Sequence, residues 1–237
     1  MMNIHRITYN PKTESASLYF IGCNFRCLCC YWKQIYGRVK LNELKLASMK
    51  DVVDLLLEAK PKSVSILSGD PVPSLDYLRL PKVLKEEIGC KVRLLTNGYI
   101  LPDLDGVTHV SMSIKALDDE LHRKYTGKSN KNCLENFKLI HKRGIELSVS
   151  SVLIPGLIEG DEIERIAAFI STIDAGIPYR IIGYMKVDGM PHREPDNEEL
   201  NRTADRARKH LKNVIFSRSK GEDYTGVIDL FTNGLRR

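Results

Sequence analysis

Four cysteines lie close together in the segment GCNFRCLCC, residues 22–30 of a 237-residue chain that contains six cysteines in all. Within this segment, the cysteine loop, Cys23, Cys27 and Cys30 have the spacing C-x3-C-x2-C. Three thiolates on one short loop can bind three irons of a 4Fe-4S cluster and leave the fourth iron without a protein ligand. Because a reacting molecule needs such an open coordination position, the spacing indicates cluster chemistry.

Two other arrangements of the cysteines remain open. A structural zinc site usually takes four ligands, and Cys90 or Cys133 could supply the fourth only if the fold brought one of them to the loop. We interpret both as small buried thiols instead. Cys29 could also take the place of Cys30 as a ligand, which would give the spacing C-x3-C-x-C.

The composition favours one globular domain in a reducing compartment. With 43% hydrophobic and 28% charged residues, a chain of this length can bury one substantial core. The first residues, MMNIHRITYN, lack the apolar core of a signal peptide, and no stretch approaches the roughly 18 apolar residues of a membrane span. We therefore expect a cytoplasmic protein without membrane association, in which clustered cysteines bind metal or catalyse rather than form disulfides.

The charged residues are mixed along the chain. The 36 basic and 30 acidic residues leave a net charge of +6, but they form no basic block. This distribution does not indicate nucleic acid binding, and the basic balance is only a hint of an anionic ligand or an acidic partner.

Short β-rich runs alternate with helical patterns along most of the chain. The predicted strands cover residues 17–20, 63–67, 91–96, 107–114, 146–154, 179–184 and 213–216. The predicted helices cover residues 49–60, 131–143, 161–174 and 196–212, with a cap at Ser48 and a stop at Gly144. This alternation predicts an α/β fold of parallel strands wrapped by helices. If the sheet curls into a barrel, the chemistry belongs on the loops after the strands, and the cysteine loop follows the first predicted strand.

The segment GCNFRCLCCYW resembles the signature loop of the radical S-adenosylmethionine (SAM) superfamily. In that family, three cysteines with this spacing hold a 4Fe-4S cluster. The open iron binds the amino and carboxylate groups of the methionine part of SAM. The resemblance implies that the cluster ligands are Cys23, Cys27 and Cys30.

Cys29 departs from the family pattern. The family usually has an aromatic residue at this position, which packs against the adenine of SAM. The resemblance therefore places Cys29 beside the adenine, where Tyr31 or Trp32 could take over part of the contact.

A second segment, LSGDP at residues 67–71, follows the second predicted strand. It resembles the family's Gly-Gly-Glu-Pro motif, whose backbone and acidic side chain hold the methionine amino group of SAM. By position, Ser68, Gly69 and Asp70 take these roles, and the shorter Asp70 carboxylate can still accept a charged hydrogen bond from an ammonium group. Without the cysteines, Gly-Asp-Pro would indicate only a turn.

Four further segments occur in the order and spacing of the glycyl-radical-enzyme activating enzymes, the family of pyruvate formate-lyase activating enzyme. They are LLTNGY, SIKALDDELHRKYTGKSN, VLIPG and IIGYMK. With the cysteine loop they cover roughly residues 15–190. The resemblance implies one radical SAM domain over residues 1–237, with a partial (β/α)6 TIM-like barrel as its core and a C-terminal helix, strand and cap over residues 191–237.

These segments add candidate residues. The resemblance places Thr96 and Asn97 beside SAM. It places Ser113 and Lys115 on the strand that faces SAM and the substrate, where the relatives have Asp and Lys. Lys115 is thus the candidate catalytic residue.

Three departures limit what can be transferred from the family. Ser113 replaces the Asp, Ser150 stands where the relatives have an arginine facing SAM, and Met185 replaces a histidine. His192 could stand in for that histidine. These three positions lose polar side chains of the relatives, while the surrounding motifs are kept. We therefore expect the same cofactor, with a different substrate or a different handling of SAM.

The resemblance implies a radical SAM enzyme, in which a reduced cluster cleaves SAM to methionine and a 5'-deoxyadenosyl radical that removes a hydrogen atom from the substrate. We expect the substrate to be a glycine of a glycyl radical enzyme. A flavodoxin or ferredoxin, whose acidic surface would suit the basic chain, is the expected electron donor. Two alternatives are radical SAM chemistry on a small molecule, nucleoside or peptide, and a non-enzymatic iron-sulfur or zinc protein.

Overall fold

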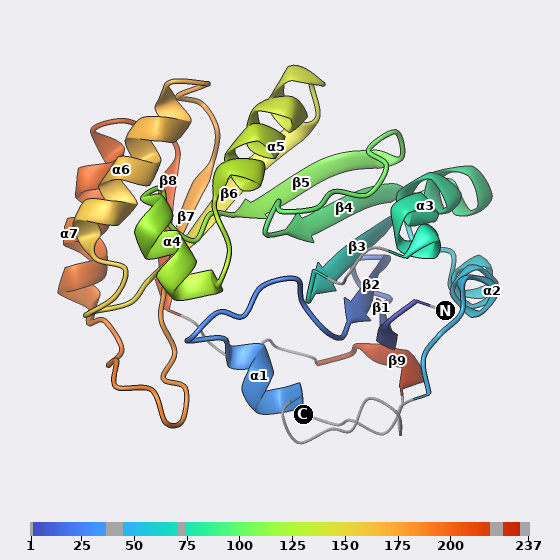
Figure 1. Ribbon diagram of the computed structural model, residues 1–237. Helices are drawn as coiled ribbons and strands as arrows, with labels where there is room; N and C mark the ends of the chain where they lie inside the picture. Colours follow the sequence, from blue (N-terminus) through green and yellow to red (C-terminus); the bar gives the residue numbers. More distant parts are fainter. Residues whose placement is uncertain (1, 37–44, 71–73, 219–224, 233–237) are drawn as a thin grey trace.

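One sheet of nine strands forms the centre of the molecule (Figure 1). The computed structural model describes residues 2–36, 45–70, 74–218 and 225–232. Within this part, the strand order is β8-β7-β6-β5-β4-β3-β2-β1-β9. The strands are β1 Ile4–Asn10, β2 Ser15–Phe20, β3 Ser63–Ser68, β4 Lys91–Thr96, β5 Val107–Ser113, β6 Glu146–Leu153, β7 Tyr179–Gly183, β8 Val214–Arg218 and β9 Ile228–Thr232.

The strands from β2 to β8 are all parallel to their neighbours. Strand β1 runs antiparallel to β2 on one side and to β9 on the other. Among the described residues, β8 and β9 end the strand order without pairing to each other, so the sheet is not closed. The predicted α/β fold with parallel strands in a partial barrel is confirmed. The sequence does not predict β1 or β9, because β1 is buried on both faces and β9 is mostly exposed, so neither alternates clearly.

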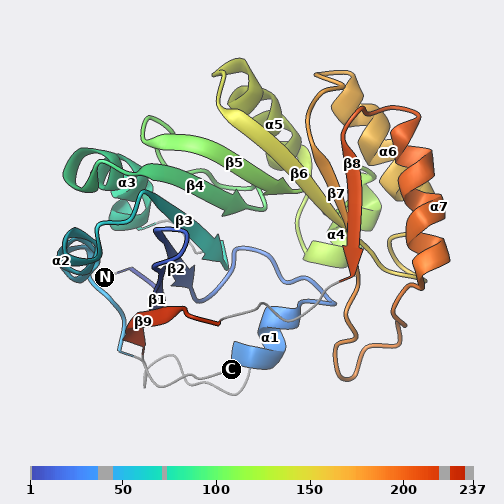
Figure 2. The same ribbon diagram turned by 180° about the vertical axis from the view of Figure 1, so that it is seen from behind.

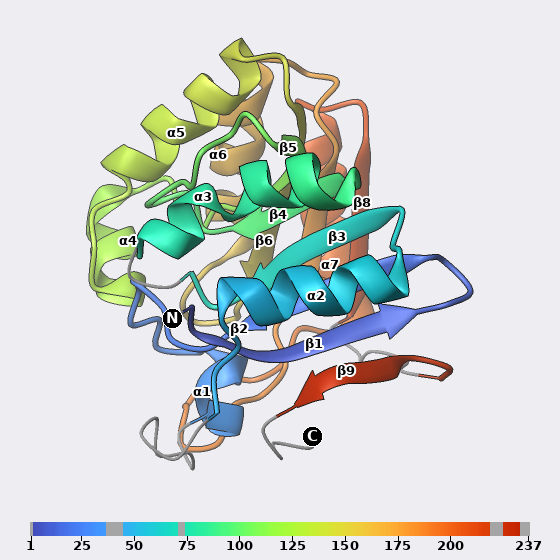
Figure 3. The same cartoon turned by 90° about the vertical axis from the view of Figure 1, so that its right-hand side faces the viewer.

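Most helices lie along the outside of the curved sheet, whereas the short helix α1 lies beyond the ends of the strands (Figures 1 and 3). They are α1 Tyr31–Tyr36, α2 Met49–Ala59, α3 Leu75–Val83, α4 Asp119–Thr126, α5 Lys131–Lys142, α6 Gly160–Ser171 and α7 Asn197–Arg208. The four predicted helices are confirmed as α2, α5, α6 and α7, with the predicted cap at Ser48 in a capping box with Asp51. The helices α1, α3 and α4 are absent from the prediction. Helices α1 and α4 are too short for a clearly repeating apolar face, and α3 carries Pro81 in its interior before it continues as a π-helix, η2 Leu84–Ile88.

The two faces of the sheet have different environments. Along β6, every second residue is buried, among them Val149 and Leu153, and these side chains belong to the core with Ile166 of α6. The opposite, inner face is accessible: Leu95, on the central strand β4, is 40% exposed. Figure 2 shows β5 to β8 from the side away from α5. The unclosed sheet therefore leaves part of its inner face open to a ligand.

A buried glutamate connects α6 to the loop after β5. Glu162 is 2% exposed, and its Oε1 accepts hydrogen bonds from the backbone N–H groups of Leu117 (2.5 Å) and Asp118 (2.9 Å). Its second oxygen forms an ion pair with Arg165. These contacts hold the loop that carries Lys115 at the start of α4.

We expect Glu162→Ala to lower the free energy of unfolding by about 2 kcal/mol, because two part-buried N–H groups would lose their acceptor. Glu162→Gln keeps an oxygen acceptor and should lose less than half as much. The exposed Glu58 of α2 provides the control, with an expected effect of Glu58→Ala below about 0.5 kcal/mol. Urea unfolding followed by circular dichroism measures all three variants, and equal losses for Ala and Gln at position 162 would contradict the hydrogen-bonding role.

Candidate functional site

The predicted motifs meet at the edge where the parallel strands end. The cysteine loop follows β2, and the loops after β3, β4 and β5 lie beside it in the strand order. Hydrogen bonds join them directly: the Asn24 N–H donates to the Asp70 carbonyl (2.7 Å), and the Asn97 side chain donates to the Cys23 sulfur (3.7 Å). Carboxyl ends of parallel strands share one edge, so segments far apart in sequence converge here.

Helix α4 holds the middle of the cysteine loop. The backbone N–H groups of Arg26 and Leu28 donate to the carbonyls of Thr126 (2.8 Å) and Tyr125 (3.0 Å) in the last turn of α4. These carbonyls have no partner within the helix, so the loop satisfies them. The ring of Phe25 is buried between α4 and the loop after β4, with its centroid 5.4 Å from that of His122 and 5.4 Å from that of Tyr99.

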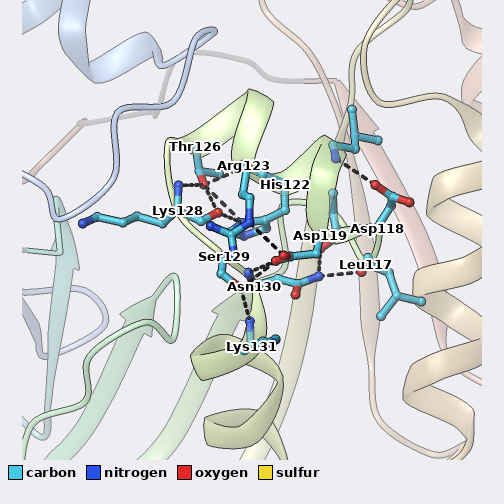
Figure 4. A network of polar contacts seen from close by, with 12 residues as sticks. Leu117, Asp118, Asp119, His122, Arg123, Thr126, Lys128, Ser129, Asn130 and Lys131 are labelled. Atoms are coloured by element: carbon cyan, nitrogen blue, oxygen red, sulfur yellow. Dashed lines mark hydrogen bonds and ion pairs between the residues drawn. The ribbon is translucent and has the colours of Figure 1, made fainter.

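The polar residues of SIKALDDELHRKYTGKSN brace α4 itself (Figure 4). The Asp119 carboxylate accepts hydrogen bonds from the Ser129 hydroxyl (2.6 Å), the Asn130 N–H (2.8 Å) and Arg123 Nε (2.8 Å). These bonds hold the pKa of Asp119 below its usual range. Much of this motif therefore builds the support for the cysteine loop.

Three of the clustered thiols are neighbours. Cys23 is exposed, and Cys27 and Cys30 are half-buried. Burial raises the pKa of the Cys27 thiol to about 11, Lys115 lowers it, and the nearby thiols of Cys30 and Cys23 raise it further. The predicted trio is thus brought together with a positive charge close by.

The fourth thiol of the loop lies elsewhere. Cys29 is buried, and burial raises the pKa of its thiol while a hydrogen bond from the Tyr184 hydroxyl lowers it. Tyr184 follows β7 and also accepts a hydrogen bond from the Val187 N–H (2.8 Å). The sulfur of Cys29 therefore faces the loop after β7, whereas Tyr31, two residues further on, is 39% exposed.

Asp70 connects three of the loops. Its Oδ1 accepts from the Thr96 hydroxyl (2.7 Å) and its Oδ2 from the Asn97 N–H (2.6 Å), while its backbone groups bond to the cysteine loop. Burial raises the pKa of Asp70 to about 6, against these hydrogen bonds and Lys115, which lower it. Each carboxylate oxygen keeps a second lone pair, so the side chain can still accept from a ligand.

Gly69 permits the loops after β2 and β3 to approach each other closely. A Cβ at this position would lie 1.6 Å from the carbonyl oxygen of Gly22. Gly22 itself has a φ of +89°, a conformation that favours glycine. The backbone of Ser68 ends β3, and its side chain lies outside the described residues.

The remaining candidates occupy the inner face and its rim. Lys115 Nζ donates to the Ser113 hydroxyl (2.8 Å), and Ser113 pairs with Ser150 on the neighbouring strand. Met185 is half-buried directly after Tyr184. The Nδ1 of His192 lies 3.0 Å from the Pro155 carbonyl, so this ring is held on the VLIPG loop.

Two cysteines outside the loop are buried, as expected. Cys90 is 6% exposed and its thiol donates to the Leu84 carbonyl (3.7 Å). Cys133 is 3% exposed at the start of α5. Within the described part of the chain, no three His, Cys, Asp or Glu side chains converge on a point that would hold a single metal ion.

The residues of the site fit a 4Fe-4S cluster. A cluster takes each thiolate on a different iron, so the three sulfurs need only be neighbours. Asn24, which the sequence analysis does not single out, also indicates a bound group: its buried Nδ2 has no hydrogen-bond partner among the described residues. An amide donor beside Cys23 fits a site in which a bound group supplies an acceptor, such as a sulfide or SAM.

No helix in the described ranges is long and apolar enough to cross a membrane.

Comparisons with known proteins agree with this geometry. The family model of the Radical SAM superfamily matches residues 18–170. A Methanocaldococcus jannaschii protein, provisionally named as a glycyl-radical enzyme activating enzyme, is 33% identical over 223 residues, which cover 89% of this chain and 84% of that protein. Pyruvate formate-lyase 1-activating enzyme of Escherichia coli K12 is 25% identical over 226 residues, which cover 84% of this chain and 90% of that enzyme.

A solved structure shows the same fold. The crystal structure of Streptococcus suis SuiB bound to S-adenosylmethionine matches with a TM-score of 0.66 at 19% sequence identity. The match covers 86% of this chain and 49% of the SuiB chain, so this chain spans about half the length of SuiB.

We expect Gly69→Ala to lose most of the iron bound after anaerobic reconstitution, because the added methyl group collides with the Gly22 backbone and displaces the cysteine loop. Gly89→Ala is the control, since no atom lies within 4 Å of an added Cβ there, while the positive φ of Gly89 (+72°) gives that substitution a backbone cost of its own. Iron and sulfide per chain measure the effect. Full iron loading of Gly69→Ala would show that the cysteine loop does not need this close approach.

We expect Cys29→Ala to bind as much iron and sulfide as the unaltered chain, because the Cys29 sulfur faces Tyr184. Cys30→Ala should lose most of both, because Cys30 lies beside Cys27. The same iron and sulfide assay compares the variants. The reverse result would assign the third ligand to Cys29.

Proposed function

Because this chain belongs to the Radical SAM superfamily, we propose that it installs a radical on a glycine of a glycyl radical enzyme. As a member of this superfamily, the chain is a radical SAM enzyme, and the family uses a 4Fe-4S cluster and SAM. The alternative of a non-enzymatic iron-sulfur or zinc protein is therefore set aside. The observation that carries the proposal is the 33% identity, over most of both chains, to a protein provisionally named as an activating enzyme.

We assign the cluster ligands to Cys23, Cys27 and Cys30. The mutual effect of these thiols on the pKa of Cys27 supports the assignment, as does the separate position of Cys29. When bound, the cluster would supply the electron that cleaves SAM to methionine and a 5'-deoxyadenosyl radical, which removes the hydrogen atom. The protein's own part is to hold the ligands, orient SAM and keep the reacting groups apart from water.

Asp70 is our candidate for binding the methionine ammonium of SAM. Its carboxylate is held from two sides by Thr96 and Asn97, so it is already oriented before a ligand arrives. Lys115, next to the cysteines and Asp70, is the candidate to contact SAM or the substrate. The other proposed contacts to SAM are Cys29, Ser68, Gly69, Thr96, Asn97, Ser113, Ser150 and Met185.

The inner face offers a route for the substrate. The exposed Leu95 on the central strand indicates that atoms outside the core can reach this face. A polypeptide loop that bears a glycine could approach Lys115 from this side, which agrees with a protein substrate.

A second candidate, radical SAM chemistry on a small anionic molecule, is favoured by the basic side chains of the same face. Arg93 and Arg180 are exposed there, and neither forms an ion pair with another residue that the structure describes. Arg180 pairs in register with Ser150, one of the positions that depart from the family pattern.

We further propose that residues 1–237 form one domain.

We also propose that a flavodoxin or ferredoxin supplies the electron. Arg26 is exposed on the cysteine loop, and Lys33 is exposed just after it. Lys33 Nζ donates to the Cys27 carbonyl (2.7 Å), so its charge is held beside the loop. Basic groups here would complement an acidic electron donor.

The test is anaerobic. The reconstituted protein is reduced with dithionite and mixed with SAM, with and without a purified glycyl radical enzyme from the same organism. We expect 5'-deoxyadenosine and an electron paramagnetic resonance (EPR) signal of a glycyl radical from the unaltered chain. Neither should form with Cys27→Ala, because its cluster would lose a ligand.

Deoxyadenosine without a glycyl radical would contradict the protein substrate and favour the small-molecule reaction. If the loaded protein gave neither product with any such enzyme of the organism, the proposed activation would be wrong.

A further inference from the structure

Hydrogen-bond donors are unevenly distributed over the three proposed ligands. The Cys23 sulfur accepts from the Phe25 N–H (3.4 Å), from the Asp70 backbone N–H and from Asn97 Nδ2 (3.7 Å). Among the described residues, no donor contacts the sulfur of Cys27 or Cys30. Two of these donors are backbone N–H groups, which are present whatever side chain the residue carries. The Asn97 amide is different, because it depends on the residue type.

The Asn97 side chain is held in one orientation. It is 5% exposed, and its Oδ1 accepts from the Tyr99 N–H (2.9 Å). Its Nδ2 also donates to Asn24 Oδ1 (2.8 Å), so one amide group is shared between Asn24 and the Cys23 sulfur. The side-chain oxygen of Asn97 thus bonds within its own turn, and the side-chain NH2 group bonds to the cysteine loop. A rotation of the side chain would break all three contacts.

Hydrogen bonds to the sulfurs of an iron-sulfur cluster help to set its reduction potential. Reduction adds negative charge, which spreads onto the ligating sulfurs. A donated N–H stabilises this added charge more than it stabilises the oxidised form. A donor at Cys23 therefore makes a bound cluster easier to reduce.

We propose that Asn97 is a positioning residue that raises the reduction potential of the cluster by donating its amide to the Cys23 sulfur. This inference rests on the ligands assigned under the proposed function. Asn24 assists, because its carbonyl oxygen holds the Asn97 amide beside the sulfur. The side chain of Asn97 thus acts on the cluster through its ligand Cys23.

Two variants at position 97 distinguish the effect of the amide donor from the effect of the side chain's shape. Asn97→Ala removes the amide, and Asn97→Asp keeps the shape but replaces the donor with a negatively charged acceptor. The matched control is Asn136→Ala. Asn136, on α5, donates to the Gly98 carbonyl (2.8 Å) and so holds the same turn without contacting the sulfur.

Each protein is reconstituted anaerobically, its iron and sulfide are measured, and the cluster is titrated with potential by EPR in the absence of substrate. We expect Asn97→Ala to lower the equilibrium constant for reduction about three- to tenfold, or about 30 to 60 mV for a one-electron couple. Asn97→Asp should lower it further, because the carboxylate adds negative charge beside the sulfur. Asn136→Ala should leave the potential unchanged.

An unchanged potential in a fully loaded Asn97→Ala would overturn the inference, and so would an equal shift in Asn136→Ala. Loss of iron from both Asn97 variants would also overturn it, because the amide would then be needed to build the loop. If Cys23→Ala kept a full cluster, the ligand assignment would fail and this inference with it. A shifted potential without activation of a glycyl radical enzyme would disprove only the proposed substrate.

Discussion

The site depends on the buried carboxylate and backbone of Asp70. Its side chain ties down the end of β4 through Thr96 and Asn97, and its backbone bonds to the cysteine loop. Burial disfavours its charge more than the hydrogen bonds favour it, so the pKa is raised to about 6. A carboxylate in such a position costs stability, and groups of this kind concentrate at functional sites. The close approach of Gly69 to Gly22 completes this junction of loops.

Two helices support this junction from outside. Helix α4 uses the free carbonyls of its last turn to hold the cysteine loop, and α6 uses Glu162 to hold the start of α4. The chain of contacts runs from α6 through α4 to the thiols. The site is therefore positioned by elements that contribute none of the proposed cluster ligands.

Asn97 illustrates how one residue can serve both structure and chemistry. Its backbone belongs to the junction at Asp70, while its side chain reaches the Cys23 sulfur and Asn24. Polar residues of a family motif need not all contact the cofactor. In SIKALDDELHRKYTGKSN, Asp119 and His122 serve the internal bonding of α4 and its packing, and Lys115 lies at the rim of the inner face.

The sequence alone determined the class of fold and the chemistry, because both depend on local patterns: the alternation of strands and helices, and thiols close together in one loop. It also placed the loops of Gly69, Asp70 and Asn97 at one edge, since parallel strands end on the same side. Only the tertiary structure decided that Cys29 turns to Tyr184 while Cys30 stays beside Cys27, because neighbouring residues of an irregular loop have no fixed period. The pairing of β1 with β9 and the contact of Asn97 with Cys23 likewise join residues distant in sequence, which no local pattern records.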